Sequence, residues 1–167
     1  SFIPVPAASF EGSFVRYSDY LLYYNGSAYY LQQSGQADPN TKDGQSQLKH
    51  IKRESLTNAE GDVYAATLAK QLHITVTDKE VDNEIAKSRA SYGDISEQVY
   101  NASAMSVFGW TPSEYRHVMK EKLLRQKVAY QIDKNALTAK DAVAAAIKAN
   151  PSADFAAVAD SVNKTAA

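Results

Sequence analysis

Thr111-Pro112-Ser113-Glu114 is the stretch that decides the fold, and Thr77-Asp78-Lys79-Glu80 is its counterpart earlier in the chain. In each stretch the threonine side chain can accept a hydrogen bond from the backbone N–H three residues later, and the glutamate can reach back to the threonine N–H. Pro112 stands at the first helical position, where no backbone donor is needed. Both stretches therefore predict helix starts, and the second helix is expected to be long and to run towards Ile132.

Outward from these two starts, the rest of the chain also follows helical patterns. Apolar or small residues recur three or four positions apart in five further segments, with expected bounds of 17–33, 48–72, 95–108, 138–150 and 154–163. No strand-rich segment is evident. The sequence predicts an all-α fold of six or seven helices, in which the long helix from Thr111 packs against the 48–72 helix.

Three regions are expected along the chain. Residues 1–16 carry two prolines and few charges, so they are expected to be extended or irregular. Residues 17–135 hold the main helices as one domain, and residues 136–167 form a short helical tail. Residues 34–46 are polar and are expected to form a loop between two helices.

The first eight residues, SFIPVPAA, are apolar and rich in small side chains. They fit the edge of a trimmed signal peptide or membrane anchor. They fit a disordered tail equally well, and both interpretations stay open.

Length and composition bound the classes of function. The chain has 167 residues, with 18 Lys and Arg against 19 Asp and Glu, a net charge of −1 and no cysteine. A chain of this size buries roughly 70% of its unfolded surface, which supports a core without disulfides or a metal. The charge balance excludes a general nucleic-acid binder and a polybasic membrane-surface protein. The lack of cysteine excludes thiol catalysis and cysteine–zinc sites, and no apolar run is long enough to span a bilayer.

No motif for catalysis, metal binding or a cofactor is present. His50, His73 and His117 stand alone, without the spacing of a metal-binding pair, and phosphate-binding glycine loops are absent. Two carboxylate pairs lie near one helix start: Asp78 with Asp82, and Glu80 with Glu84. We expect these acids to be solvated and to serve the helix dipole.

One further charged pair is expected to be structural. Glu121 and Arg125 stand four residues apart on the long helix, with the acid on the N-terminal side. This arrangement is favourable on a helix surface. We expect the two side chains to pair on the outer face.

A cluster of tyrosines is the most distinctive feature. Six of the eleven tyrosines fall between positions 17 and 30, and they cannot all face one side of a helix. They either fill core edges, which is somewhat the more frequent role, or line a surface that binds apolar segments. Met105, Phe108 and Trp110 form a second apolar cluster around a helix end. The candidate polypeptide-binding residues from both clusters are Tyr20, Tyr23, Tyr24, Tyr30, Met105 and Trp110.

Three pieces of the chain, in this order and spacing, carry a resemblance to a known family. They are TVTDKEVDNEI at 75–85, FGWTPSEYR at 108–116 and KLLRQKV at 122–128. Together they resemble the N-terminal chaperone region of the SurA and PrsA type of bacterial foldases. The resemblance covers about half the chain, over residues 48–130. It implies a helical domain that holds unfolded or nascent exported polypeptides outside the cytoplasm, with an anchor possible outside this chain.

A weaker resemblance concerns the tail. Residues 141–163, with ADFAAVA at 153–159, are similar to a helical pattern of parvulin-type prolyl isomerases. The strand that precedes this pattern in the family has no counterpart at 130–134, and no histidine follows His117. The resemblance therefore implies that the isomerase domain is absent or degenerate in this chain.

Three hypotheses follow. The leading one is a non-enzymatic chaperone module that binds apolar and aromatic segments of unfolded secreted or envelope proteins. The second is the helical part of a prolyl isomerase whose catalytic domain lies elsewhere. The third is a structural module at the cell surface that binds one dedicated partner. Client identity and oligomeric state stay open.

Overall fold

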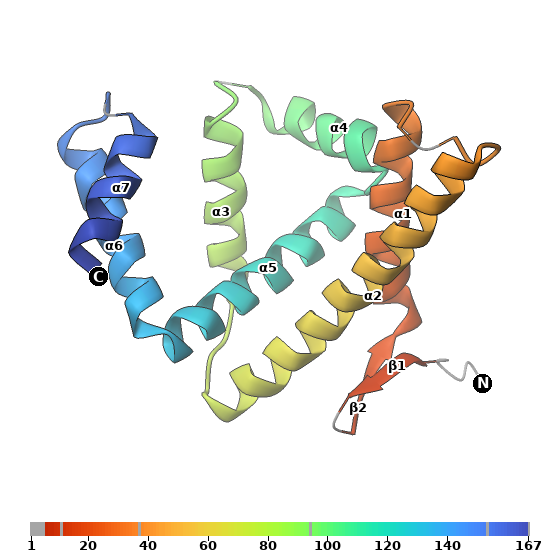
Figure 1. Cartoon of the computed structure of the whole chain (residues 1–167), viewed down its shortest axis with the longest axis horizontal. Coiled ribbons are helices and arrows are strands. Elements are labelled where there is room, and N and C mark those ends of the chain that lie inside the picture. Colours follow the sequence, from red (N-terminus) through yellow and green to blue (C-terminus); the bar gives the residue numbers. More distant parts are fainter. Residues whose placement is uncertain (1–5, 11, 37, 94, 153, 167) are drawn as a thin grey trace. The chain divides into compact units, whose positions relative to one another are not determined.

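The computed structural model describes residues 6–10, 12–36, 38–93, 95–152 and 154–166 of the chain (Figure 1). Over these residues the chain forms seven helices and one two-stranded sheet, so the predicted all-α fold class is confirmed. The elements in chain order are β1 (Pro6–Phe10), β2 (Ser13–Arg16), α1 (Tyr17–Gln33), α2 (Lys42–Gln71), α3 (Asp78–Ala90), α4 (Glu97–Phe108), α5 (Pro112–Ile132), α6 (Lys134–Ala149) and α7 (Phe155–Ala166). Residues 1–5 and 11 of the expected extended segment, and Ala153 of the parvulin-like pattern, lie outside the described residues.

The strands β1 and β2 form an antiparallel hairpin, which the sequence analysis did not predict. Ala8 pairs with Val15 and Ser9 with Phe14. Gly12 has a φ of 81°, a left-handed value that a residue with a side chain rarely adopts. Because each strand spans only a few residues, its alternation is too short to recognise in the sequence. In the structure, Val15 of β2 is fully buried against the helices, and this burial stabilises the hairpin.

The helix α2 begins at Lys42, inside the stretch that was expected to be a loop. Thr41 starts the helix, since its hydroxyl accepts a hydrogen bond from the Gly44 N–H at 3.0 Å. Gly44 is needed here because a Cβ at this position would lie 1.9 Å from the carbonyl oxygen of Asp38. The prediction of a loop over 34–46 is therefore wrong from residue 42 onward. The first turn of α2 is polar in composition, so it resembles a loop in the sequence.

One core cluster joins the hairpin to the long helices. Val15, Tyr23 and Ala59 are buried at its centre, and Val63 and Val118 pack against them. Val118 belongs to α5, so the long helix packs on the same core cluster to which α2 contributes Ala59. The helices α1 and α2 lie side by side over this cluster (Figure 1).

A second core cluster holds α3 against α5. Val76, Val81 and Met119 are buried in it. At the start of α3 the predicted capping box is confirmed: the Thr77 hydroxyl accepts from the Glu80 N–H at 3.3 Å, and the Glu80 carboxylate accepts from the Thr77 N–H at 2.9 Å.

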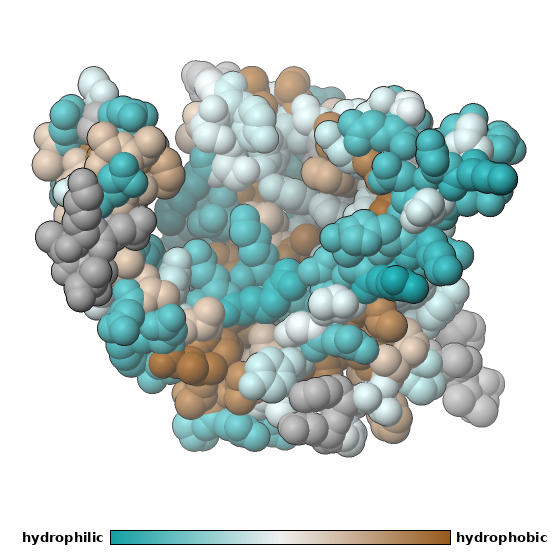
Figure 2. Space-filling view, in the orientation of Figure 1, coloured by the Kyte–Doolittle hydropathy of each residue, from teal (hydrophilic) through white to brown (hydrophobic). Residues whose placement is uncertain are grey.

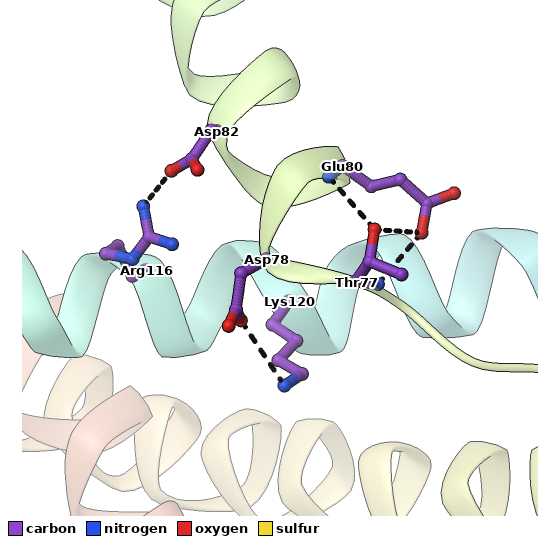
Figure 3. A network of polar contacts seen from close by, with 6 residues as sticks. All are labelled: Thr77, Asp78, Glu80, Asp82, Arg116 and Lys120. Carbon is purple, nitrogen blue, oxygen red and sulfur yellow. Dashed lines mark hydrogen bonds and ion pairs between the residues drawn. The ribbon is translucent and has the colours of Figure 1, made fainter.

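Two acids at the start of α3 also reach α5 (Figure 3). Asp82 is hydrogen-bonded by Arg116, and a carboxylate oxygen of Asp78 lies 3.9 Å from the Lys120 Nζ. The sequence analysis explained these exposed acids by the helix dipole alone. The structure adds a second role, because both acids form ion pairs between helices that are distant in sequence.

The predicted outer pair of Glu121 and Arg125 is wrong. The Nε of Arg125 lies 3.1 Å from Oδ1 of Asp62, a buried carboxylate on α2. A buried charge without a partner is costly, so the guanidinium turns inward rather than along its own helix.

The chain divides into two compact units, residues 1–125 and 126–167, with the division inside α5. The sequence analysis placed the end of the main domain at 135. In the second unit α6 and α7 run side by side, and α6 begins earlier than the expected residue 138 because Asp133 caps it. None of the described helices combines the length and the apolar character needed to cross a bilayer.

Candidate functional site

A buried polar network in the first unit decides the role of Tyr23. Its hydroxyl donates to Oδ2 of Asp62 at 2.5 Å, and Arg125 pairs with the other oxygen of the same carboxylate. Burial raises the pKa of both the Tyr23 phenol and the Asp62 carboxyl above their ordinary values. Only 9% of Tyr23 is exposed, so its ring packs in the core.

The first candidate site is a groove between the hairpin, α1 and α2. We call it the hairpin groove; it has a volume of about 480 Å³ and is lined by Pro6, Ala7, Tyr17, Tyr20, Lys52, Arg53 and Leu56. The strand β2 leads directly into α1, which places Tyr17 at the first helical position and Tyr20 one turn later. The apolar floor is thus supplied by β1 and by Leu56 of α2, and the charged rim by Lys52 and Arg53, one turn before Leu56 on the same helix.

The tyrosine rings of α1 form a ladder along this groove. The ring centroids of Tyr17 and Tyr20 lie 5.7 Å apart, and those of Tyr20 and Tyr24 lie 6.0 Å apart with the planes nearly parallel, at 11°. The Nζ of Lys52 lies 5.9 Å from the centroid of the Tyr24 ring, within the range of a cation–π contact. The ladder is half-exposed and rigid, which suits contact with apolar side chains.

The second candidate site is a pocket between α3, α4 and α5. We call it the α4 pocket; its volume is about 270 Å³ and its lining is Ser88, Tyr92, Ile95, Tyr100, Ser103, Val107, Phe108 and Tyr115. The Tyr100 hydroxyl lies 2.6 Å from both the Ser88 Oγ and the Tyr115 hydroxyl. Burial, followed by the hydrogen bond with Tyr100, raises the pKa of the Tyr115 phenol above its ordinary value, so this phenol stays neutral. The pocket therefore offers apolar and aromatic walls with one uncharged polar point.

Trp110 has a structural role in the contact of α1 with the α4–α5 turn. Its Nε1–H donates to the carbonyl oxygen of Leu22 at 3.0 Å, and its ring stacks on Phe108 with centroids 4.7 Å apart. A Cβ added at Gly26 would lie 2.5 Å from Trp110 Nε1, so the ring fills the space that this glycine leaves. The half-buried indole is thus held in place by contacts within the fold, and it also lines an open pocket of about 380 Å³ together with Leu22 and Tyr29.

Tyr30 and Met105 remain on the surface near Phe108. Tyr30 is 44% exposed, with its ring centroid 6.2 Å from that of Phe108. Met105 is 48% exposed and lies one turn before Phe108 on α4. Neither residue lines the hairpin groove or the α4 pocket.

The structure therefore separates the six candidate residues into three places. Tyr20 and Tyr24 stack beside the hairpin groove, Tyr30 and Met105 lie around Phe108, and Tyr23 and Trp110 are engaged inside the fold.

Sequence reasoning missed the residues that complete the two sites. Lys52 and Arg53 follow Lys49 at three and four residues on α2, and this spacing was a readable signal for a basic stripe on one helix face. Tyr100 and Tyr115 had no such signal, because only the packing of α4 against α5 brings their hydroxyls together.

Neither site contains a recognisable catalytic arrangement. Among the described residues, no three or more His, Asp or Glu side chains gather where they could hold a metal ion. His50 pairs with Glu54 along its own helix at 3.2 Å, and the His117 Nε2 lies 3.9 Å from an Asp19 oxygen. Neither histidine lines the hairpin groove or the α4 pocket. The two sites can therefore provide apolar contacts, ring stacking and a few polar or charged side chains for a ligand.

Comparison with known proteins gives one match. Residues 5–129 match the family described as the SurA-like N-terminal domain. Neither the curated proteins nor the solved structures contain a match to the chain. The matched range covers the hairpin, α1 to α4, most of α5 and both candidate sites. The resemblance seen in the sequence from residue 48 onward thus extends to the hairpin and the tyrosine helix, and the chain belongs to the family of SurA-like N-terminal domains.

Proposed function

We propose that this chain is a chaperone module that holds apolar and aromatic segments of unfolded polypeptides. Its family supports a chaperone-type helical module and polypeptide clients in general. The observation that carries the proposal is the pair of open, tyrosine-walled sites of about 480 and 270 Å³ in the matched region.

The binding mechanism is burial of apolar surface. Each Å² of apolar surface removed from water contributes roughly 25 cal/mol, before the ordering of the client is subtracted. Sites of this size accept single side chains rather than whole elements. Binding at each site is therefore weak and tolerant of sequence, which allows release of the client.

The clients would be unfolded or nascent exported proteins. SurA-like domains are typical of extracytoplasmic chaperones, and this supports the periplasm or the outer face of the cell membrane as the place of action. We find no observation that favours an isomerase activity within these residues.

The test is light scattering from a chemically unfolded client diluted into buffer, with and without the chain at matching concentration. Suppressed scattering is the expected result. Unchanged scattering with several unrelated clients would overturn the proposal, and saturable binding of a single folded protein would then identify a dedicated partner-binding module.

A pair of variants assigns the effect to a site. Tyr17→Ser combined with Tyr20→Ser removes two rings of the hairpin groove and should weaken suppression. Phe155→Ser is the matched control, because Phe155 is 65% exposed and belongs to the second unit. Equal suppression by both variants would remove the hairpin groove from the proposed function.

A further inference from the structure

We propose that the hairpin groove selects extended polypeptide segments in which a carboxylate stands two residues from an apolar or aromatic residue, on the same face. This inference rests on the proposed function and names the class of client segment that the groove prefers. The groove joins an apolar floor to a basic rim, and this combination distinguishes it from the uncharged α4 pocket.

The basic rim comes from one face of α2. Lys52 and Arg53 line the groove, and Lys49 lies one turn before them on the same side of the helix. All three side chains are exposed. In Figure 2 the visible face over the first part of α2 is largely hydrophilic.

These three cations are not neutralised by the fold. No carboxylate among the described residues lies within ion-pair distance of Lys49, Lys52 or Arg53. Other cations of the first unit are paired, such as Arg16 with Asp19 at 3.3 Å. A ligand carboxylate entering the groove would therefore find basic groups without displacing an internal carboxylate, since Lys52 contacts the face of the Tyr24 ring.

The apolar part of the groove specifies what accompanies the charge. Tyr17 and Tyr20 contribute aromatic surface, and Ala7 on β1 and Leu56 on α2 contribute further apolar surface beside the basic rim. An aromatic or aliphatic side chain of the client can lie on the tyrosine rings while a carboxylate two residues along the client reaches Lys52 or Arg53. Side chains two residues apart on an extended chain point to the same side and are about 7 Å apart, close enough for this double contact.

The groove also favours an extended backbone. Pro6 and Ala7 belong to β1, which pairs with β2 along one edge in a two-stranded sheet. In general, a strand at the edge of a sheet can pair with an extended chain. Charge complementarity and this edge together point to an acidic, extended segment. The net charge of −1 for the whole chain argues against a polyanion such as a nucleic acid.

The experiment uses three labelled peptides that share two phenylalanines and differ only in the residues two positions from each phenylalanine: aspartate, asparagine or lysine. Fluorescence anisotropy with the whole chain measures each Kd at low salt. The aspartate peptide should bind about threefold to tenfold more tightly than the asparagine peptide, as expected for two exposed ion pairs. The difference should shrink at high salt because screening weakens exposed pairs.

Charge reversal assigns the preference to the groove. Lys52→Glu with Arg53→Glu should shift the preference from the aspartate peptide to the lysine peptide. The matched control is Lys79→Glu with Lys122→Glu, which changes the net charge equally at two exposed lysines outside the groove. The control should keep the wild-type order of affinities, and an equal change in both variants would overturn the proposal.

The remaining outcomes separate this inference from the proposed function. If clients are protected from aggregation but the three peptides bind alike, the charge preference is overturned and the chaperone function stands. If no peptide binds and no client is protected, both fail. If a single-stranded oligonucleotide displaces the aspartate peptide with an affinity equal to that of the peptide itself, the groove is a general anion site. That result would also overturn the proposal.

Discussion

The phenol of Tyr23 on α1 donates a 2.5 Å hydrogen bond to Oδ2 of Asp62 on α2, inside the core of the first unit. The Nε of Arg125 on α5 lies 3.1 Å from the other oxygen of the same carboxylate, within ion-pair distance but without hydrogen-bond geometry. A buried carboxylate needs such partners, because burial removes the water molecules that would otherwise stabilise its charge. Three helices that are far apart in sequence therefore meet at one acid.

Replacing Tyr23 by phenylalanine should destabilise the fold. Tyr23→Phe keeps the ring but leaves Oδ2 of Asp62 without its donor, which costs about 1–3 kcal/mol in the free energy of unfolding. Urea unfolding followed by circular dichroism measures the change. The control is Tyr30→Phe, on an exposed ring, where a change below about 0.5 kcal/mol is expected. Equal stabilities of the two variants would contradict the role of the network.

The half-buried Glu121 should make stability depend on pH. Burial, followed by the nearby Asp62, raises the pKa of Glu121 above its ordinary value. Between the unfolded pKa of about 4.3 and the higher folded pKa, the folded chain binds more protons than the unfolded chain. The stability contributed by this group is therefore greatest below the unfolded pKa and is lost as pH rises to the folded pKa.

The variant Glu121→Gln removes this titration. It should be more stable than the wild type at neutral pH, and its free energy of unfolding should decline less as pH rises from about 4 to 7. Urea unfolding at a series of pH values measures both effects. Superimposable pH profiles of the variant and the wild type would show that Glu121 is not the titrating group.

Two glycines inside helices should respond in opposite ways to alanine. Gly61→Ala on α2 should stabilise the chain by about 0.5–1 kcal/mol, since its nearest neighbour, Arg125 Nη1, would lie at an ordinary 3.8 Å. Gly26→Ala should destabilise it, because the new Cβ would meet Trp110 at 2.5 Å. Thermal unfolding checks both. In the Trp110→Leu background, Gly26→Ala should lose most of its penalty, and an unchanged penalty there would locate the clash elsewhere.

Tyr92 should affect client binding more than stability. It is 70% exposed at the α4 pocket, and its ring centroid lies 6.1 Å from that of Tyr100. Tyr92→Ser should change the free energy of unfolding by less than about 0.5 kcal/mol while weakening the suppression of client aggregation. Thermal unfolding and light scattering on the same preparation separate the two effects. Full suppression by a folded Tyr92→Ser chain would exclude the α4 pocket as a client site.

Short sequence patterns correctly predicted those parts of the fold that depend on residues close together in the chain. The capping box at Thr77 and the end of α4 at Gly109 both lie where the sequence predicts them. The start of α2 was missed because Thr41 caps it from within a polar stretch, and the pairing of β1 with β2 was missed because the strands are short.

The candidate site was only partly readable. The tyrosines of α1 stand out in composition, but the sequence could not separate Tyr20, which lines a groove, from Tyr23, which is buried. The two rings belong to the same helix, and the side on which α2 and the hairpin pack decides which one is covered. Arg125 likewise pairs with Asp62 instead of Glu121 because tertiary packing brings Asp62 of α2 next to it.

By itself, the sequence determined the helical class, the caps of its best-marked helices and the resemblance to SurA-type chaperone regions, because periodicity, capping and short motifs depend on residues close together in the chain. Only the tertiary structure decided which tyrosines are buried, which acids pair between helices, and how Lys52 and Arg53 come to face an apolar groove beside β1. Those features depend on contacts between residues far apart in sequence, and burial against a distant helix leaves no local pattern.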